Sequence, residues 1–322
     1  MNENMSKFFR WMELQGRAST VPCYRKALLR YDEWLTANRL DVLVVSSNVL
    51  MSFQRWLAEE YRRPNDRKPL KKSTQATWLS AVKAFHRWMY RRGNAIHDPA
   101  RALKLPKIKR KSVVAAHLNQ QEATAVIQTQ AKIVAEKKKG SRQWAAEFRN
   151  LAMLALALAT GRRRETLLSL RVKDLDFERK EVRIEWEKGR PGRVLPCAGW
   201  AMTIALEYIK RARPVIAPRP DPSWLFAGVR TPRVCSEYLG RLLVQVQAKT
   251  VEANPDLEEL AEKELSSHSL RATFATMMFL NGAGIRVINE LLLHRQISTT
   301  ARYTPLELDD LRRACRLAHP RA

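Results

Sequence analysis

One short segment of this chain carries the two-residue repeat of a β-strand, whereas most of the remainder carries the repeat of a helix. Between residues 182 and 186, apolar Val182, Ile184 and Trp186 alternate with charged side chains, the pattern of a half-buried strand. Turn residues rich in glycine and proline follow at 188–192, and the segment 193–196 predicts a return strand. The chain is therefore predicted to be mainly α-helical, with one small β-hairpin or sheet, and to be helical from the hairpin to its end.

Apolar residues at helical spacing predict three helices within the first hundred residues. The faces that carry this spacing are Tyr24, Ala27, Leu28, Tyr31 and Trp34, then Val49, Phe53, Trp56 and Leu57, and finally Trp78, Val82, Phe85 and Met89. A further helical pattern starts near Asn119, and residues 148–160 are apolar enough to predict a buried helix. Length favours two domains. We expect a helical domain at 1–107, a basic linker at 108–116 and a second domain at 117–322 that includes the hairpin.

The charge balance predicts a polyanionic partner. The chain has 58 Lys or Arg against 32 Asp or Glu, and its first 107 residues alone have 21 against 9. Because both parts are basic, nucleic acid gripped by both is favoured over a basic tail on a neutral protein. An acidic membrane surface is the rival partner, but no apolar stretch is long enough to span a bilayer.

Composition also bears on compartment and cofactors. The N-terminus lacks the apolar core of a signal peptide, which predicts a cytoplasmic protein. The four cysteines, at 23, 197, 235 and 315, include no C-x-x-C pair, so we expect reduced thiols and no metal site.

Several residues with the chemistry of phosphate transfer are spread over the second half of the chain. Three consecutive arginines, 162–164, follow Gly161, and His268 and Arg271 have the i, i+3 spacing that places both on one face of a helix. Tyr303 follows His294 by nine residues. Each feature is weak alone, because basic runs are mostly solvated and a lone histidine is mostly structural. Together they supply a phosphate clamp, proton-transfer groups and a hydroxyl nucleophile, which suits transesterification of a phosphodiester with no metal or cofactor.

The set, in this order, resembles the tyrosine recombinases, the family of phage and mobile-element integrases and Xer-type recombinases. The residues that carry the resemblance are Thr160-Gly161-Arg162-Arg163, Lys188, His268-Ser269-Leu270-Arg271, Leu292-Leu293-His294 and Tyr303. It implies a two-domain DNA clamp, with a SAM-like core-binding domain at 1–107 and a catalytic domain ending in a helix. The function implied is site-specific cleavage and rejoining of DNA strands, and we favour a mobile genetic element as its setting.

The resemblance also implies a role for each residue. Arg163 and Arg271 would bind the phosphate oxygens, His294 would add a hydrogen bond, His268 would take the tyrosine proton, Lys188 would protonate the leaving 5′-oxygen, and Tyr303 would form a 3′-phosphotyrosine. Further DNA contacts are predicted at Lys107, Lys109, Arg110, Lys111, Arg162 and Arg164. Four protomers on two sites, accessory DNA-bending or directionality factors and association with the bacterial nucleoid are expected from the family.

Three positions depart from the family pattern. Thr166, beside Glu165, stands where a glutamate is usual, Ala272 where histidine is frequent, and Leu293 where glycine is common. None removes a group that performs chemistry. Two alternatives stay open: an accessory DNA-binding protein of the same fold, and a type IB topoisomerase-like enzyme that relaxes supercoils without pairing sites.

Overall fold

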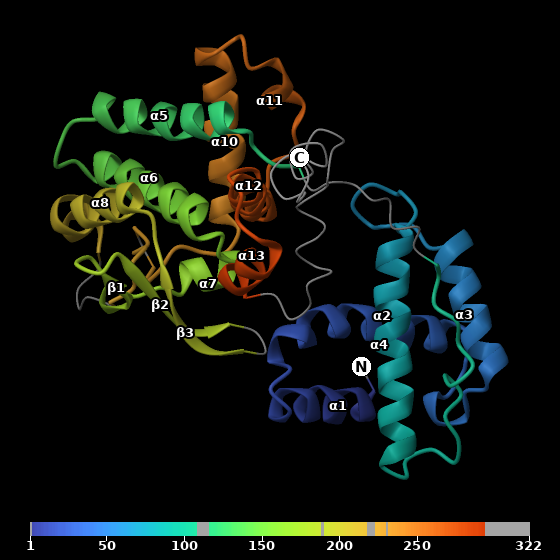
Figure 1. The fold of residues 1–322 in the computed structure, drawn as a ribbon. Helices are drawn as coiled ribbons and strands as arrows, with labels where there is room; N and C mark the ends of the chain where they lie inside the picture. The colour runs from blue at the N-terminus through green and yellow to red at the C-terminus, as the bar shows by residue number, and fades with distance from the viewer. Residues whose placement is uncertain (1, 108–115, 188–189, 218–222, 230, 294–322) are drawn as a thin grey trace, which may run out of the picture. The chain divides into compact units, whose positions relative to one another are not determined.

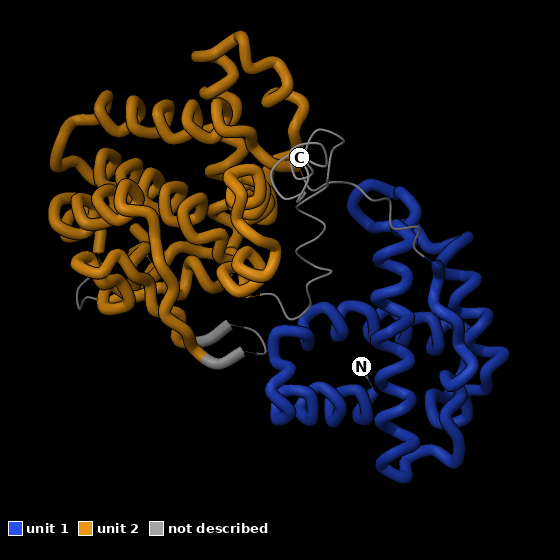
Figure 2. The backbone as a smooth tube through the Cα atoms, viewed as in Figure 1, with its two compact units in different colours: residues 1–111 blue, residues 112–322 orange. Residues whose placement is uncertain are grey.

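The computed structural model describes residues 2–107, 116–187, 190–217, 223–229 and 231–293. The chain forms two compact units, residues 1–111 and residues 112–322 (Figure 2). Each unit has a hydrophobic core of its own. Among the helices of these ranges, none combines the length and the apolar character that crossing a bilayer requires.

The described part of the first unit contains four α-helices (Figure 1). They are α1 (Glu3–Leu14), α2 (Val21–Ala37), α3 (Ser47–Glu59) and α4 (Lys72–Arg91). Side-chain caps fix two of the starts, because Asn2 accepts a hydrogen bond from the Asn4 amide and Ser46 accepts one from the Val49 amide. The three helices predicted from apolar spacing are confirmed as α2, α3 and α4.

A polar pair lies inside the core of the first unit. Tyr31 on α2 and His86 on α4 are both buried, and the Tyr31 hydroxyl lies 2.9 Å from His86 Nε2. Burial lowers the pKa of His86 to about 4 and raises the pKa of Tyr31, because the charged forms lose water. At neutral pH both groups are therefore uncharged, and each supplies the other with a hydrogen-bond partner.

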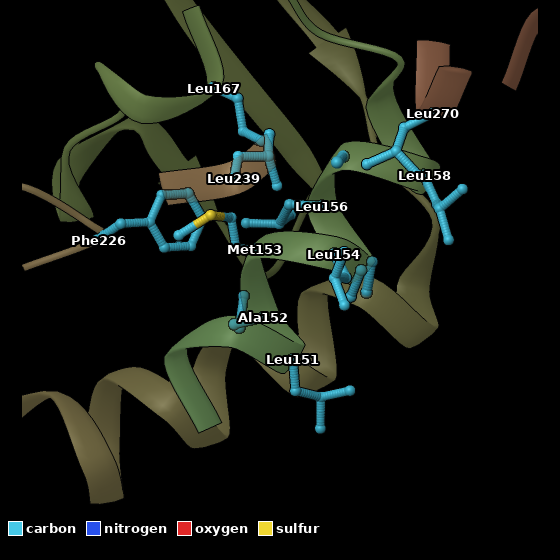
Figure 3. Close-up of a cluster of buried hydrophobic side chains, with 14 of the residues drawn as sticks. Leu151, Ala152, Met153, Leu154, Leu156, Leu158, Leu167, Phe226, Leu239 and Leu270 are labelled. Carbon is cyan, nitrogen blue, oxygen red and sulfur yellow. The ribbon is translucent and has the colours of Figure 1, made fainter. Parts of the chain in front are cut away.

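A helix whose second half is buried on every side lies in the core of the second unit. The α-helices in the described part of this unit are α5 (Gln120–Glu136), α6 (Arg142–Thr160), α7 (Arg164–Leu168), α8 (Gly199–Glu207), α9 (Arg213–Ile216), α10 (Tyr238–Ala253), α11 (Glu258–Glu262), α12 (Ser267–Leu280) and α13 (Ile285–Leu292). Residues 151–158 of α6 are all buried, and Leu167, Phe226, Leu239 and Leu270 from other segments belong to the same cluster (Figure 3). The predicted buried helix is thus confirmed, and it begins earlier, at Arg142.

The predicted hairpin is confirmed as part of a three-stranded antiparallel sheet with strand order β1-β2-β3. The strands are β1 (Leu175–Asp176), β2 (Glu181–Glu187) and β3 (Arg190–Pro196). Val182 pairs with Leu195, and Glu187 pairs with Arg190. Val182 and Ile184 are buried while Arg183 and Glu185 are exposed, as the alternation predicts. The sequence did not predict β1, which is only two residues long.

The expectation of continuous helix after the hairpin is wrong between α9 and α10. Prolines at 218, 220 and 222 cannot donate the hydrogen bonds of a helix. In the described residues that follow, the chain is extended or turned, and Leu225, Phe226 and Ala227 are fully buried. The Leu225 amide donates to the Leu170 carbonyl at 2.8 Å, which fastens this segment to the chain just after α7.

A buried carboxylate fixes the start of α5. The Glu122 amide donates to Asn119 Oδ1 at 2.8 Å, and the Asn119 amide donates to Glu122 Oε2 at 2.7 Å, which together form a capping box. The Glu122 side chain is only 1% exposed, and Lys263 donates to both of its oxygens at 2.7 Å. This ion pair ties α5 to the segment just after α11.

Candidate functional site

The turn that contains the three arginines begins at a glycine that no other residue can replace without strain. Gly161 ends α6 with φ of +59°, in the left-handed region. A Cβ atom at this position would lie 2.6 Å from Phe274 Cδ1 and 2.9 Å from Leu292 Cδ2. Glycine therefore serves two purposes: it allows the turn, and it lets α12 and α13 approach the turn closely.

Arg271 connects three of the sequence motifs. Its side chain, on α12, is 2% exposed. Nη1 donates to the Gly161 carbonyl at 2.8 Å, and Nη2 donates to the Leu292 carbonyl. One guanidinium group thus joins α12, the turn that leads into Arg163 and the end of α13, two residues before His294 in the sequence.

Arg162 is also buried, at 3% exposure. Nε donates to the Thr160 carbonyl at 3.0 Å, and Nη2 donates to the Leu291 carbonyl. Its side chain therefore lies between the turn and α13. The sequence predicted a DNA contact for this residue, and the run of three arginines gave no sign that the first one points into the protein.

Arg163 and His268 lie on neighbouring elements at the same place. Arg163 is partly buried, and its carbonyl accepts the Leu167 amide at 2.8 Å, so the residue forms the entry to α7. His268 lies in the first turn of α12. Partial desolvation, followed by the positive charges of Arg271, Arg163 and Arg164, lowers the pKa of His268. The structure therefore brings His268 close to Arg163, Arg164 and Arg271. These charges favour a neutral imidazole, which can accept a proton.

Of the other predicted site residues, two lie in the part of the chain that the structure describes and six lie outside it. Lys107 is exposed, and Arg164 is partly exposed beside Glu165, whose Oε1 lies 3.1 Å from Arg164 Nη2. The residues outside the described part are Lys109, Arg110, Lys111, Lys188, His294 and Tyr303.

The structure shows how the three departures from the family pattern are accommodated. Thr166 and Ala272 are buried, at 8% and 1% exposure. Leu293 caps α13 with φ of +52°, in the left-handed region where glycine is common. That conformation costs a leucine about 1–2 kcal/mol, but its side chain is 2% exposed and belongs to the core of the second unit. Such burial contributes about 1.5–3 kcal/mol, which offsets the strain.

An ion pair that the sequence did not reveal joins the hairpin to α13. Arg193 Nη1 on β3 lies 2.5 Å from Glu290 Oε2 on α13. The two residues are 97 positions apart, so no local spacing could have identified the pair. It links the strand that follows Lys188 to the helix that precedes His294.

Comparison with known families gives two matches that together cover most of the chain. Residues 118–308 match the Phage integrase family, and residues 6–93 match the Phage integrase, N-terminal SAM-like domain. The tyrosine recombinase XerC of Roseiflexus sp. is 31% identical over 309 residues, which cover 94% of this chain and 89% of that protein. XerC of Pelobacter propionicus is 29% identical over 304 residues, covering 94% and 90%.

Solved structures share the fold. The XerH site-specific recombinase bound to difH substrate matches with a TM-score of 0.66 at 19% identity, over 92% of this chain and 79% of that one. A lambda integrase dimer bound to a COC′ core site matches with a TM-score of 0.61 at 14% identity, over 96% and 99%. The predicted family resemblance and the mainly helical fold with a small sheet are both confirmed.

Proposed function

The chain belongs to the phage integrase family of tyrosine recombinases, and we propose that it cleaves and rejoins duplex DNA at specific sites through a 3′-phosphotyrosine on Tyr303. The observation that carries the assignment of residues is the position of Arg271. Its two hydrogen bonds join the His268–Arg271 motif to the turn at Thr160–Arg163 and to the end of α13.

In this proposal Arg163 and Arg271 bind the non-bridging oxygens of the scissile phosphate. Attack on a phosphodiester passes through a pentacoordinate state in which more negative charge gathers on these oxygens. Planar guanidinium groups match that charge with paired donors. The bonds from Arg271 to two main-chain carbonyls fix the plane of its guanidinium before substrate binds, which is the condition for electrostatic stabilisation at low reorganisation cost.

Proton transfer falls to His268 and Lys188. The bond from Tyr303 Oη to phosphorus forms as the bond from phosphorus to the 5′-oxygen breaks. His268 takes the phenolic proton, and Lys188 gives a proton to the departing 5′-oxygen, while His294 donates to the phosphate. A phenol of pKa about 10 needs such a base near neutral pH. A 5′-hydroxyl from another strand then reverses the step, and the phosphotyrosine conserves the bond energy without a cofactor.

The positive charge serves DNA binding. Neutralising phosphates releases counterions, so affinity should fall steeply with salt. We propose that residues 1–107 and 117–322 both bind the duplex. The linker at 108–116 would follow the sugar-phosphate backbone of the DNA. The proposed DNA contacts outside the catalytic set are Lys107, Lys109, Arg110, Lys111 and Arg164. Four protomers would assemble on two sites, with accessory factors controlling direction.

A mobile genetic element is the proposed setting. The net charge of +26 and the departures at Thr166, Ala272 and Leu293 from the pattern usual in Xer recombinases support it. Resolution of plasmid or chromosome dimers uses the same chemistry. The sequence of the trapped DNA site distinguishes these settings.

Covalent trapping tests the proposal. The protein is incubated with a pool of random-sequence duplexes, each nicked so that cleavage releases a short fragment that diffuses away. We expect a DNA-linked protein after denaturation with the wild type and none with Tyr303→Phe, although both bind DNA. Binding without an adduct would instead identify an accessory binder. Relaxation of supercoiled plasmids of any sequence by the protein alone would point to a topoisomerase.

A further inference from the structure

We propose that Arg162 is a positioning residue that fastens the end of α13 to the arginine turn and thereby sets the place of Arg163. The inference rests on the proposed strand cleavage and goes beyond the catalytic set. It also gives Arg162 a role other than the DNA contact that the sequence suggested.

The burial of Arg162 argues for an internal role. Its side chain is 3% exposed, whereas its neighbours Arg163 and Arg164 are more open to solvent. Burying a cation is costly unless its donors are satisfied. Here Nε and Nη2 donate to the carbonyls of Thr160 and Leu291, which supply that satisfaction from within the protein.

The carbonyls at the end of α13 show what Arg162 does. The last four carbonyls of a helix have no partner within the helix, and in α13 these belong to residues 289–292. The Leu293 amide donates to the first two, those of Asn289 and Glu290. Arg162 donates to the third, Leu291, and Arg271 to the fourth, Leu292. Two cations therefore complete the helix end, where the helix dipole also favours positive charge.

This arrangement ties the position of Arg163 to that of α13. The backbone of Arg162 runs directly into Arg163, and its side chain is fixed to the Leu291 carbonyl, 129 residues away in the sequence. Without that bond, the turn would lose one of its ties to α13, although the Arg271 bond to the Leu292 carbonyl would remain. A shift of the turn by about 1 Å can lower a rate about a hundredfold, because Arg163 must meet phosphate oxygens at fixed distances.

Arg162→Met and Arg162→Lys test the proposal in the full-length chain. Methionine keeps the buried stem without the donors, and lysine keeps the charge but not the planar fork. The matched control is Arg149→Met. Arg149 lies on α6, the helix that precedes the turn. Its side chain is 2% exposed and donates to the Ala227 carbonyl at 2.8 Å, away from the motifs.

Three quantities are measured for each variant: thermal unfolding, DNA affinity over a range of salt concentrations, and single-turnover cleavage of trapped-site DNA at saturating protein below the unfolding temperature. We expect Arg162→Met to cleave about 10- to 100-fold more slowly when bound, with affinity and its salt dependence unchanged. Arg162→Lys should recover part of the rate. Arg149→Met should lose stability but keep the wild-type rate.

Two results would overturn the proposal. If Arg162→Met weakens binding and lowers the slope of log affinity against log salt by about one, the residue is a DNA contact. If both Arg162 variants are less stable but cleave at the wild-type rate when bound, its role is structural only. Lack of cleavage by the wild type would instead count against the proposed function itself, so the two failures are distinguishable.

Discussion

Lys263 donates to both carboxylate oxygens of Glu122 at 2.7 Å, although the two residues lie 141 positions apart. Glu122 is buried and also closes the capping box at the start of α5. The pair therefore connects a helix start to the chain that leads into α12, which carries His268 and Arg271.

Removing Lys263 should destabilise the second unit strongly. Lys263→Met leaves the Glu122 carboxylate buried without its cation, a change that costs about 3–5 kcal/mol. Urea unfolding measures the loss. The control is Lys173→Met, which breaks an exposed pair with Glu185 at 3.1 Å and should cost less than about 1 kcal/mol. Equal losses in the two variants would show that the burial of Glu122 does not matter.

Gly161→Ala should destabilise the protein more than Gly282→Ala, although both glycines have a positive φ. The new methyl group would collide with Phe274 and Leu292 and would also occupy a strained backbone, at a total cost of about 2–4 kcal/mol. Gly282 has φ of +87° and nothing within 4 Å of the position of an added Cβ. Its replacement therefore measures the cost of the strained backbone without any collision. Gly282→Ala should cost about 1–2 kcal/mol, and thermal unfolding of both variants compares them.

The first unit should lose stability in acid because of His86. Its folded pKa is about 4, below the ordinary value near 6.5, so the unfolded chain binds the proton first as pH falls. Stability is therefore fully present above about pH 6.5 and declines by up to about 3 kcal/mol toward pH 4. Hydrogen exchange of α2 and α4 peptides in urea, pulsed at one fixed pH after equilibration at each test pH, measures this decline.

Replacing His86 provides the control for that measurement. His86→Gln removes the titrating group and should flatten the pH dependence over this range, although the variant is less stable at neutral pH. An undiminished acid slope in His86→Gln would assign the effect to other groups.

Cleavage should depend on a neutral His268. Its pKa is lowered from the ordinary value near 6.5. The rate should therefore fall on acidification, as the imidazole becomes protonated, at a lower pH than an ordinary histidine would give. Arg164→Met removes one of the cations that lower this pKa and should move the acid limb toward higher pH. Single-turnover rates across the pH range measure the shift. A wild-type rate that shows no fall in acid would remove His268 from the role of base.

The ion pair between Arg193 and Glu290 should support cleavage modestly. Both side chains are about half exposed, and exposed pairs contribute about 0.2–1 kcal/mol. Arg193→Glu or Glu290→Arg alone should therefore slow cleavage by up to about fivefold. The double reversal should restore the rate if the pair couples the hairpin to α13. Equal cleavage rates in the two single variants and the double variant would show that the pair does not couple the hairpin to α13.

Much of the fold could be predicted because its signals are local. The spacing of Leu28, Tyr31 and Trp34 predicted α2, and the alternation of Val182 with Ile184 predicted β2. Residues whose role depends on distant partners could not be assigned in this way. β1 is too short to show a period, and the buried segment around Phe226 follows prolines that only indicate the end of a helix.

The candidate site likewise contains residues that the sequence could identify and one whose role it could not. The types and order of Arg163, His268 and Arg271 pointed to phosphate chemistry, and the structure gathers them in one place. The burial of Arg162 gave no local signal, because three adjacent arginines look like a solvated face. Its partner, the carbonyl of Leu291, is a main-chain atom and leaves no trace in the sequence.

The central position of α6 has a consequence for how the protein fails under stress. Residues 151–158 are buried around the whole helix, and the Gly161 amide still donates into it, to the Ala157 carbonyl at 3.0 Å. The arginine turn is therefore continuous with the most buried helix of the unit, which we expect to open last, whereas ligand-binding segments are commonly drawn from parts that open early. Heat or denaturant should leave no folded but inactive form in which only this turn has frayed. The arginine turn and the core of the second unit would be lost in a single cooperative event.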